Sequence, residues 1–285
     1  MRAEDRRSPA APPRAAPPPA TGPRIDSFGA GEPVVVLQTA LGADELLPLT
    51  LALGALDGLR AVHWHRRGYA GTGEAPVGAS MGDLADQAAA VIARAGIAPV
   101  HLVGVSFSAA LALTLAMASP RNVHTLTLVE PPPFAGRAQR EFRAANAGLV
   151  GTYEEHGAPA ALERFVTMLV GEHWRTTLEA EQPGAVAAMD RDAEAFFRSD
   201  LPALWSWGLE PAAVGRLECP VLAVGGEDSD PWFAQARLQL RRWLPSLDEA
   251  TIPGAGHLVG SMHPGRVAEL IEPFLRRHPR GAAHR

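Results

Sequence analysis

The stretch LVGVSFSAA, residues 102–110, is the most informative part of the sequence for the fold. An apolar run typical of a buried strand leads into a serine, and an apolar segment with a helical pattern follows directly. The pattern predicts a strand over residues 100–105 and a helix over residues 107–118. Ser106 therefore stands at a tight strand-to-helix turn. Such a turn exposes a serine hydroxyl at the carboxyl edge of a sheet, so Ser106 is predicted to be a nucleophile.

The neighbours of this serine are small, as the turn requires. A strained turn leaves no room for side chains two positions before and two positions after the serine. Gly104 meets that demand and Ser108 nearly does, although the usual pattern Gly-x-Ser-x-Gly has glycine at the last position. The amino end of the following helix also directs backbone N–H groups toward a developing negative charge.

Apolar runs and helical patterns alternate on both sides of this turn, which predicts an α/β fold with a mostly parallel, doubly wound sheet covered on both faces. Further strands are predicted at residues 34–37, 61–64, 123–129, 221–224 and 249–252. Further helices are predicted at residues 44–56, 80–95, 232–243 and 264–277.

Two segments depart from the alternation. Residues 1–24 carry seven prolines and five arginines with no run of large apolar side chains, which predicts a disordered leader. Residues 134–212 contain helical patterns and no strand, which predicts a helical cap inserted into the core. The core is then formed by residues 25–133 and 213–285.

A histidine and several acids complete a possible triad. His257 follows the Gly-rich segment IPGAG after the last predicted strand, where an imidazole could take the serine proton. Asp228 follows the strand at 221–224 and is our first choice for the carboxylate that orients the imidazole. Asp230 and Glu130 remain alternatives, and Glu130 is a genuine rival because it ends the preceding core strand.

The order serine, acid, histidine and the motifs around these residues resemble the α/β-hydrolase superfamily, specifically its capped, serine-nucleophile branch, over residues 25–278. The loop RRGYAG at 66–71 shares in this resemblance. The resemblance implies an oxyanion hole formed by the backbone N–H groups of Ala40 and Phe107. Gln38 and Thr39 stand where many relatives have His-Gly, which is a departure from the family pattern.

A serine nucleophile implies acyl chemistry, so we expect hydrolysis of an ester, lactone or thioester of a small, largely apolar molecule through an acyl-enzyme. Trp205 and Trp207 in the cap are predicted to contact the substrate. Two alternatives stay open. The same site could serve intramolecular acyl transfer, cyclisation or C–C bond hydrolysis, or the chain could be a ligand-binding relative without catalysis.

Composition bounds the remaining possibilities. The formal charge of −5 and the absence of long apolar runs predict neither a nucleic-acid partner nor a membrane span, so a small-molecule substrate and a cytoplasmic location are expected. All 26 basic residues are arginine, which excludes a Ser-Lys dyad. No cofactor is predicted. No metal is predicted either: His63 and His65 alternate on one strand, but a packing role is favoured. The sequence indicates no oligomeric state.

Overall fold

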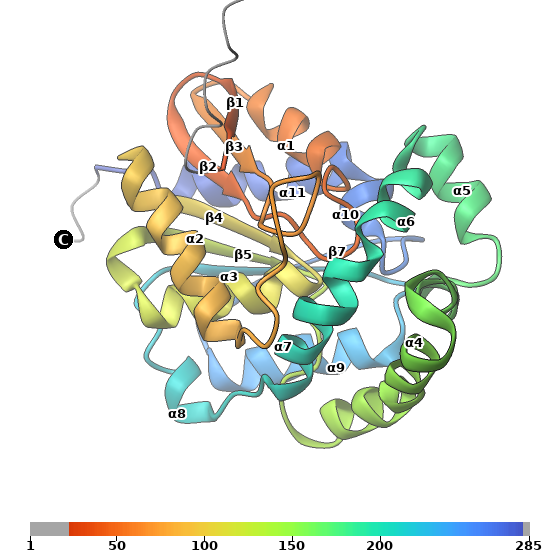
Figure 1. Ribbon diagram of the computed structural model, residues 1–285. Helices are drawn as coiled ribbons and strands as arrows, with labels where there is room; N and C mark the ends of the chain where they lie inside the picture. The colour runs from red at the N-terminus through yellow and green to blue at the C-terminus, as the bar shows by residue number, and fades with distance from the viewer. Residues whose placement is uncertain (1–22, 282–285) are drawn as a thin grey trace, which may run out of the picture.

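A seven-stranded sheet forms the centre of the molecule in the computed structural model, which describes residues 23–281 (Figure 1). The strand order is β1-β3-β2-β4-β5-β6-β7, and only β1 runs antiparallel to its neighbour. The strands are β1 (Ile25–Gly29), β2 (Glu32–Val36), β3 (Leu59–Trp64), β4 (Val100–Val105), β5 (Val123–Val129), β6 (Val221–Gly226) and β7 (Asp248–Ile252). The expected mostly parallel α/β sheet is confirmed.

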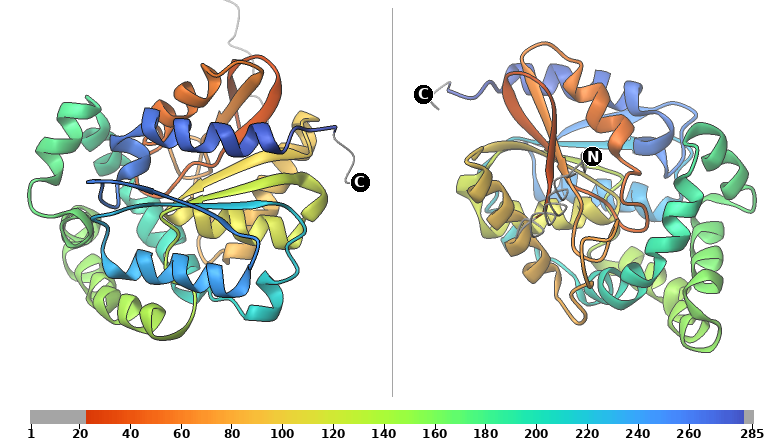
Figure 2. Two further views of the ribbon diagram at one scale, coloured as in Figure 1. Left: turned by 180° about the vertical axis from the view of Figure 1, so that it is seen from behind. Right: turned by 45° about the horizontal axis from the view of Figure 1, so that its top comes forward.

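Helices cover both faces of this sheet, as Figure 2 shows from behind. Two separate apolar clusters result, one on each face. One face carries α2 (Met81–Ala95), α3 (Phe107–Ala118) and α9 (Pro231–Trp243). The other carries α1 (Leu47–Gly54), α10 (Val259–Met262) and α11 (Pro264–Arg277). The central strands β4 and β6 are buried along their whole length, which explains their continuous apolar sequence.

Local sequence signals account for several boundaries. Ser80 and Asp83 form a capping box at the start of α2, and Gly96 ends that helix in the left-handed conformation. A short 3₁₀ turn, η1 (Pro120–Asn122), precedes β5. The edge strand β1 was missing from the sequence prediction. Its residues IDSFG are half-buried or exposed, so it lacks the apolar run of a central strand.

Only helices lie between β5 and β6. They are α4 (Gly136–Val170), α5 (Trp174–Glu181), α6 (Ala185–Ala195), the π-helical turn η2 (Phe196–Asp200), α7 (Leu201–Ser206) and α8 (Pro211–Val214). We call them the helical insertion. Helix α4 kinks at Gly157, which has a φ of 81° and is followed by Pro159. Figure 1 shows the insertion beside the core. The boundaries at 134 and 212 stay a prediction.

The predicted leader falls almost wholly outside the described residues, since residues 1–22 precede them and β1 begins at Ile25. Within residues 23–281, no helix has both the length and the apolar character to cross a lipid bilayer.

Candidate active site

Ser106 occupies the turn between β4 and α3 with a strained backbone, at φ 51° and ψ −119°. Left-handed φ values are uncommon outside glycine and cluster at functional sites. Gly104 permits this turn, because a Cβ built on it would lie 2.2 Å from the backbone oxygen of Ser108. The sequence requirement for a small residue at 104 therefore comes from the close approach of α3 to the end of β4.

Ser108, the departure from the usual motif, has a structural role. Its Oγ accepts a hydrogen bond from the N–H of Val105 at 2.9 Å and lies 3.0 Å from the oxygen of Val105, to which it can donate. The side chain is completely buried. A glycine could make neither contact, so the hydroxyl of Ser108 ties the first turn of α3 to the last residue of β4.

His257 meets Ser106 from the other end of the chain. Its Nε2 lies 3.0 Å from the Oγ of Ser106. The imidazole is 5% exposed and stacks on Phe233 of α9, with ring centroids 3.8 Å apart. Burial and stacking restrict the ring to one orientation, so the convergence of serine and imidazole expected from sequence is present in the structure.

The acid beside this histidine is Glu130, whose Oε2 lies 3.2 Å from Nδ1 of His257. The prediction that Asp228 contacts this imidazole is corrected, because Glu130 occupies that position. Glu130 follows β5, is fully buried and has a left-handed φ of 49°. The carboxyl ends of β5 and β6 lie side by side, so an acid from either strand could have reached the imidazole. Glu130 was the rival named from sequence.

The N–H of one glycine and the guanidinium of one arginine hold the Glu130 carboxylate. Its Oε1 accepts hydrogen bonds of 2.8 Å from the N–H of Gly226 and from Nη1 of Arg237. A Cβ on Gly225 would lie 1.9 Å from Nη1 of Arg237, so only glycine leaves room for the guanidinium to reach Glu130. The Gly225-Gly226 pair therefore serves the acid of the neighbouring strand.

The two rejected acids have other positions. Asp228 is exposed, and its carboxylate makes no hydrogen bond or ion pair with any residue from 23 to 281. Its backbone N–H donates to the oxygen of Ala255. Asp230 caps α9, since its carboxylate accepts a hydrogen bond of 3.0 Å from the N–H of Trp232. Neither side chain contacts His257 by hydrogen bonding.

The backbone groups expected to form an oxyanion hole lie at the site. Ala40 and Phe107 line one small cavity together with Ser106 and His257. The N–H of Phe107 belongs to the first residue of α3, where a helix leaves its N–H groups without helical partners. Leu41, next to Ala40, has a left-handed φ of 72°. This strain parallels that at Ser106 and Glu130: Leu41 and Ser106 line the cavity, and Glu130 contacts His257, which also lines it.

A buried ion pair supports the segment that carries Ala40. Arg66 donates to both carboxylate oxygens of Asp200, at 2.9 and 2.5 Å, and to the backbone oxygen of Thr39 at 3.0 Å. Asp200 also accepts from the hydroxyl of Tyr69. Burial is the largest single influence and works to lower the pKa of Arg66, but the charge and hydrogen bonds of Asp200 together with the contacts to Tyr69 outweigh it and raise that pKa. Asp200 comes from η2, so the helical insertion is tied to this segment.

The cavity at Ser106 is small and mostly apolar, with a volume of about 60 Å³. The sequence did not identify its aromatic lining, which comes from α4, η2 and α9. These residues are Phe142, Phe165, Phe196 and Phe233. In the sequence, each of these residues is an aromatic side chain within a helical pattern. That pattern equally predicts packing in the core.

The predicted substrate contacts Trp205 and Trp207 do not line this cavity and are corrected. Trp205 borders a separate small pocket with Leu201 and Leu204. Trp207 is 6% exposed, donates from Nε1 to Oγ1 of Thr114 at 3.0 Å and packs edge-on against Phe134. Trp207 therefore packs the insertion against α3.

A buried acid, Glu45, also lines the cavity. Glu45 is buried, and burial raises its pKa to about 7 against the opposing effect of a hydrogen bond from Ser261. The Oγ of Ser261 donates to Oε1 of Glu45 at 3.2 Å. Sequence reasoning did not single out Glu45, because nothing in the local pattern distinguishes it from a surface acid.

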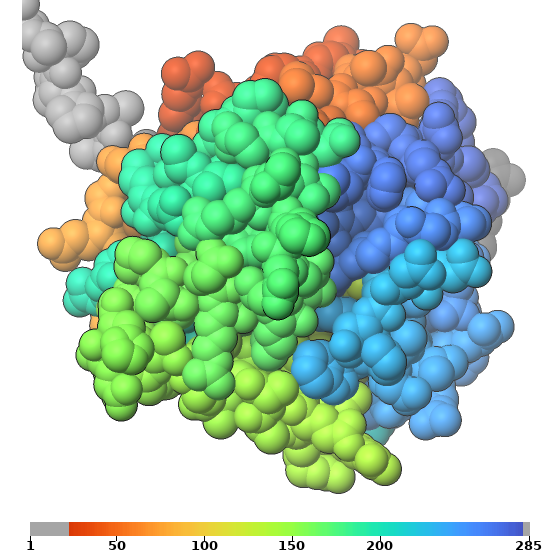
Figure 3. Space-filling view, turned by 90° about the vertical axis from the view of Figure 1, so that its right-hand side faces the viewer, coloured from red at the N-terminus to blue at the C-terminus, as the bar shows by residue number. Residues whose placement is uncertain are grey.

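A larger cleft of about 370 Å³ adjoins the small cavity and shares His257, Leu169 and Leu258 with it. It lies between α4 and α5 on one side and residues 256–263 on the other. Figure 3 shows this face, where the green helices of the insertion meet the blue C-terminal segments. A substrate entering through this cleft would pass His257 before reaching Ser106.

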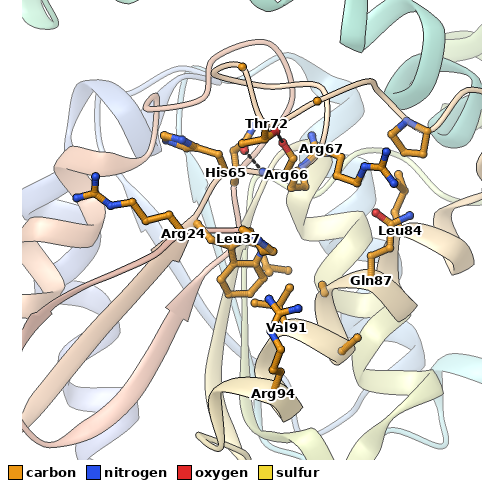
Figure 4. A pocket seen from close by; sticks show the side chains of 18 residues that line it. Arg24, Leu37, His65, Arg66, Arg67, Thr72, Leu84, Gln87, Val91 and Arg94 are labelled. Atoms are coloured by element: carbon orange, nitrogen blue, oxygen red, sulfur yellow. Dashed lines mark hydrogen bonds between the residues drawn. The ribbon is translucent and has the colours of Figure 1, made fainter. Parts of the chain in front are cut away.

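A larger cavity, of about 740 Å³, lies elsewhere, between α2 and the ends of β2 and β3 (Figure 4). Arg67, Leu84 and Gln87 border it, and neither Ser106 nor His257 does. We therefore place the candidate active site at the smaller cavity, where the hydrogen-bonded serine, histidine and glutamate meet.

Residues 33–264 match the family model described as alpha/beta hydrolase fold. The chain belongs to the α/β-hydrolase family. The resemblance noted from sequence is thereby confirmed, and the molecule is an α/β-hydrolase enzyme. A search among curated proteins found no match to this hydrolase.

Solved structures similar to this α/β-hydrolase include a thermophilic esterase from Thermogutta terrifontis, with TM-score 0.74 and 20% identity over 90% of this chain and 94% of that one. A bromoperoxidase from Bacillus anthracis has TM-score 0.73 and 17% identity over 88% and 94%. The enol-lactonase from Burkholderia xenovorans has TM-score 0.72 and 17% identity over 89% and 96%. At these identities the likeness shows the fold.

Proposed function

We propose that this α/β-hydrolase cleaves an ester bond of a small, largely apolar molecule through an acyl-enzyme on Ser106. The observation that carries the proposal is the hydrogen-bonded series Ser106, His257 and Glu130 beside an apolar cavity. Serine, imidazole and carboxylate in this arrangement are the components of nucleophilic acyl transfer. The esterase and lactonase among similar structures support this substrate class.

Acylation begins when Oγ of Ser106 forms a bond to the carbonyl carbon while its proton moves to Nε2 of His257. The tetrahedral intermediate collapses as the ester C–O bond breaks, and the imidazolium returns the proton to the leaving alcohol. Glu130 accepts from Nδ1–H of His257 throughout, which fixes the tautomer and stabilises the imidazolium. Arg237 and Gly226 hold the other oxygen of Glu130, so the carboxylate is fixed in position beside the imidazole.

Deacylation uses the same groups in reverse order. Nε2 of His257 takes a proton from water, whose oxygen attacks the acyl carbon. The bond between that carbon and Oγ of Ser106 then breaks as the imidazolium returns the proton to Oγ, which releases the carboxylic acid and restores the free enzyme. The N–H groups of Ala40 and Phe107 are assigned to the oxyanion in both steps. Each such donor typically contributes about 3 kcal/mol to stabilising the transition state.

The cavity suggests how the substrate is placed. Its small volume and aromatic wall suit a short apolar acyl group, whereas the cleft of about 370 Å³ beyond His257 can hold the leaving group. We therefore expect esters of short acyl chains to be preferred over esters of long ones.

The test combines a substrate series with a chemical probe. Wild-type protein should hydrolyse p-nitrophenyl esters with kcat/KM falling as the acyl chain lengthens, and Ser106→Ala should lower kcat by at least about 10³-fold. A fluorophosphonate probe should label wild type at Ser106, with the labelled peptide identified by mass spectrometry. If the folded protein is not labelled, or if Ser106→Ala retains wild-type turnover, the proposed mechanism is wrong.

A further inference from the structure

Two histidines and an aspartate come together near the segment that carries Ala40. His63 lies on β3, His65 follows that strand, and Asp44 lies in the loop after β2. Each offers one ligand atom, and these atoms all lie within 4.8 Å of one another. Within residues 23–281 this is the only such group of three. The serine chemistry proposed above makes no use of it.

The surroundings of the His63 imidazole suit the binding of a metal ion. His63 is 1% exposed, and its Nδ1 faces the backbone oxygen of Val36 at 3.4 Å. Its Nε2 is buried and has no hydrogen-bond partner. Metal-binding histidines usually donate their second ring N–H to a carbonyl or carboxylate, which leaves the other nitrogen's lone pair for the metal. The contact with Val36 fixes that tautomer.

Burial is the largest influence on the pKa of His63 and lowers it, whereas the Val36 and Ala43 backbone groups and Asp44 work in the opposite direction. Burial thus favours the neutral form of the imidazole. A neutral imidazole is the form that binds metal ions. An unpartnered buried nitrogen otherwise has a cost in stability, which a bound ion would remove.

The other two groups can move to complete the site. Nε2 of His65 lies 2.8 Å from Oδ1 of Asp44, and both side chains reach solvent. A tetrahedral zinc site with bonds near 2.0–2.1 Å separates neighbouring ligand atoms by about 3.3 Å. Small rotations of the half-buried His65 and the exposed Asp44 side chains would bring the three ligand atoms, which now lie within 4.8 Å of one another, to that spacing.

We propose that Asp44, His63 and His65 bind one divalent transition-metal ion of the zinc class. Two imidazoles and one carboxylate are ligands that Zn²⁺ accepts, whereas Mg²⁺ and Ca²⁺ require a shell of oxygen ligands. Three protein ligands leave a position for water. His65 also lines the large cavity of Figure 4, which gives the ion and its water a route from solvent.

The ion would join the end of β3 to the loop after β2. Asp44 lies four residues after Ala40, so the bound metal would stabilise the segment assigned to the oxyanion hole. The site is independent of the proposed hydrolysis. Metal binding should therefore remain in Ser106→Ala.

The experiment titrates Zn²⁺ into metal-free, full-length protein carrying no histidine tag, in competition with a chelator of known affinity. We expect one ion per chain and a rise in Tm on binding. Co²⁺ in place of Zn²⁺ should give the intense visible absorption of a tetrahedral site. Asp44→Asn and His65→Ala should each weaken Zn²⁺ binding by about 100-fold, because each removes a metal ligand. Removal of a residue that only supports a ligand typically costs this much or less.

His156→Ala is the matched control, because His156 is exposed and lies 3.7 Å from its own neighbouring carboxylate, Glu155. It should bind Zn²⁺ as wild type does. Substitution of the buried His63 is expected to destabilise the fold. The test therefore uses Asp44 and His65, whose side chains reach solvent. No saturable binding in excess Zn²⁺, or saturable binding that survives both Asp44→Asn and His65→Ala, would overturn the proposal.

Discussion

Oε2 of Glu130 lies 3.2 Å from Nδ1 of His257, although 127 residues separate the two in the chain. The carboxylate has no exposed surface, and its second oxygen is held by Arg237 and Gly226. A buried charge is stable only when it is paired and hydrogen-bonded. Groups from β6 and α9 therefore hold the carboxylate in place, and the glycine pair at the end of β6 is part of this arrangement.

Replacing this acid should disable the histidine. Glu130→Gln should lower kcat for a p-nitrophenyl ester by about 10³- to 10⁴-fold, because an amide can stabilise the wrong tautomer and cannot balance the imidazolium charge. Steady-state kinetics on purified variants gives the measurement. Asp228→Asn is the matched control and should stay within about threefold of wild type, since exposed substitutions away from such contacts have small effects. The reverse ranking would restore Asp228 as the acid.

The ion pair between Arg66 and Asp200 should matter for both stability and rate. Asp200→Asn leaves the buried Arg66 charge without its partner, which should cost about 3–5 kcal/mol of unfolding free energy. Because Arg66 also holds the oxygen of Thr39, a displaced segment should lower kcat by about 10- to 100-fold with little change in KM.

Denaturant unfolding and steady-state kinetics test this pair of effects. Asp190→Asn is the control, because Asp190 pairs with Arg175 at the surface and should contribute at most about 1 kcal/mol. An Asp200→Asn variant as stable and as active as the Asp190→Asn variant would show that the pair does not support the site.

Glu45 should make stability fall as pH rises. Its pKa is raised from 4.5 to about 7 in the folded protein, so between these values the folded state keeps a proton that the unfolded chain has lost. The stabilisation is complete below pH 4.5 and is lost as pH rises through about 7, amounting to at most about 3 kcal/mol. Glu45→Gln stays neutral and should be the more stable protein at pH 8.

Thermal unfolding of both proteins at pH 5 and pH 8 checks this difference, which should nearly vanish at pH 5. Glu74→Gln, at an exposed position, serves as the control and should track wild type at both values. An equal effect of Glu45→Gln at pH 5 and pH 8 would contradict a titrating Glu45.

The turn at Ser106 should tolerate little change on either side. Gly104→Ala places a Cβ 2.2 Å from a backbone oxygen and should cost more than about 3 kcal/mol or prevent folding. Ser108→Gly should cost about 1–3 kcal/mol, because it removes two buried hydrogen bonds to Val105 and adds a glycine to α3.

Chemical denaturation ranks these variants. Gly82→Ala in α2 is a control of opposite sign, because a Cβ there meets only ordinary contact at 3.5 Å and should stabilise the helix by up to about 1 kcal/mol. If Ser108→Gly proved as stable as wild type, the hydroxyl would have no role in the turn.

Much of the fold was accessible from sequence because its signals are local. The helix over residues 107–118 agrees with α3, and the helix over 264–277 agrees with α11. The parallel order followed from alternating strands and helices. The edge strand β1 escaped prediction because a half-exposed antiparallel strand needs no apolar run. Lining residues such as Phe165 and Phe196 also escaped, because an aromatic side chain in a helix looks alike whether it faces a cavity or the core.

Local sequence patterns were sufficient to predict the alternating architecture, the serine at the turn and the histidine after the last strand, because periodicity and small residues act over a few neighbouring positions. The contact of Glu130, and not Asp228, with the imidazole became evident only in the folded molecule. Both acids follow adjacent strands that end at one sheet edge. The choice depended on the left-handed backbone at Glu130 and on the space over Gly225 that admits Arg237, and these are relations between distant segments.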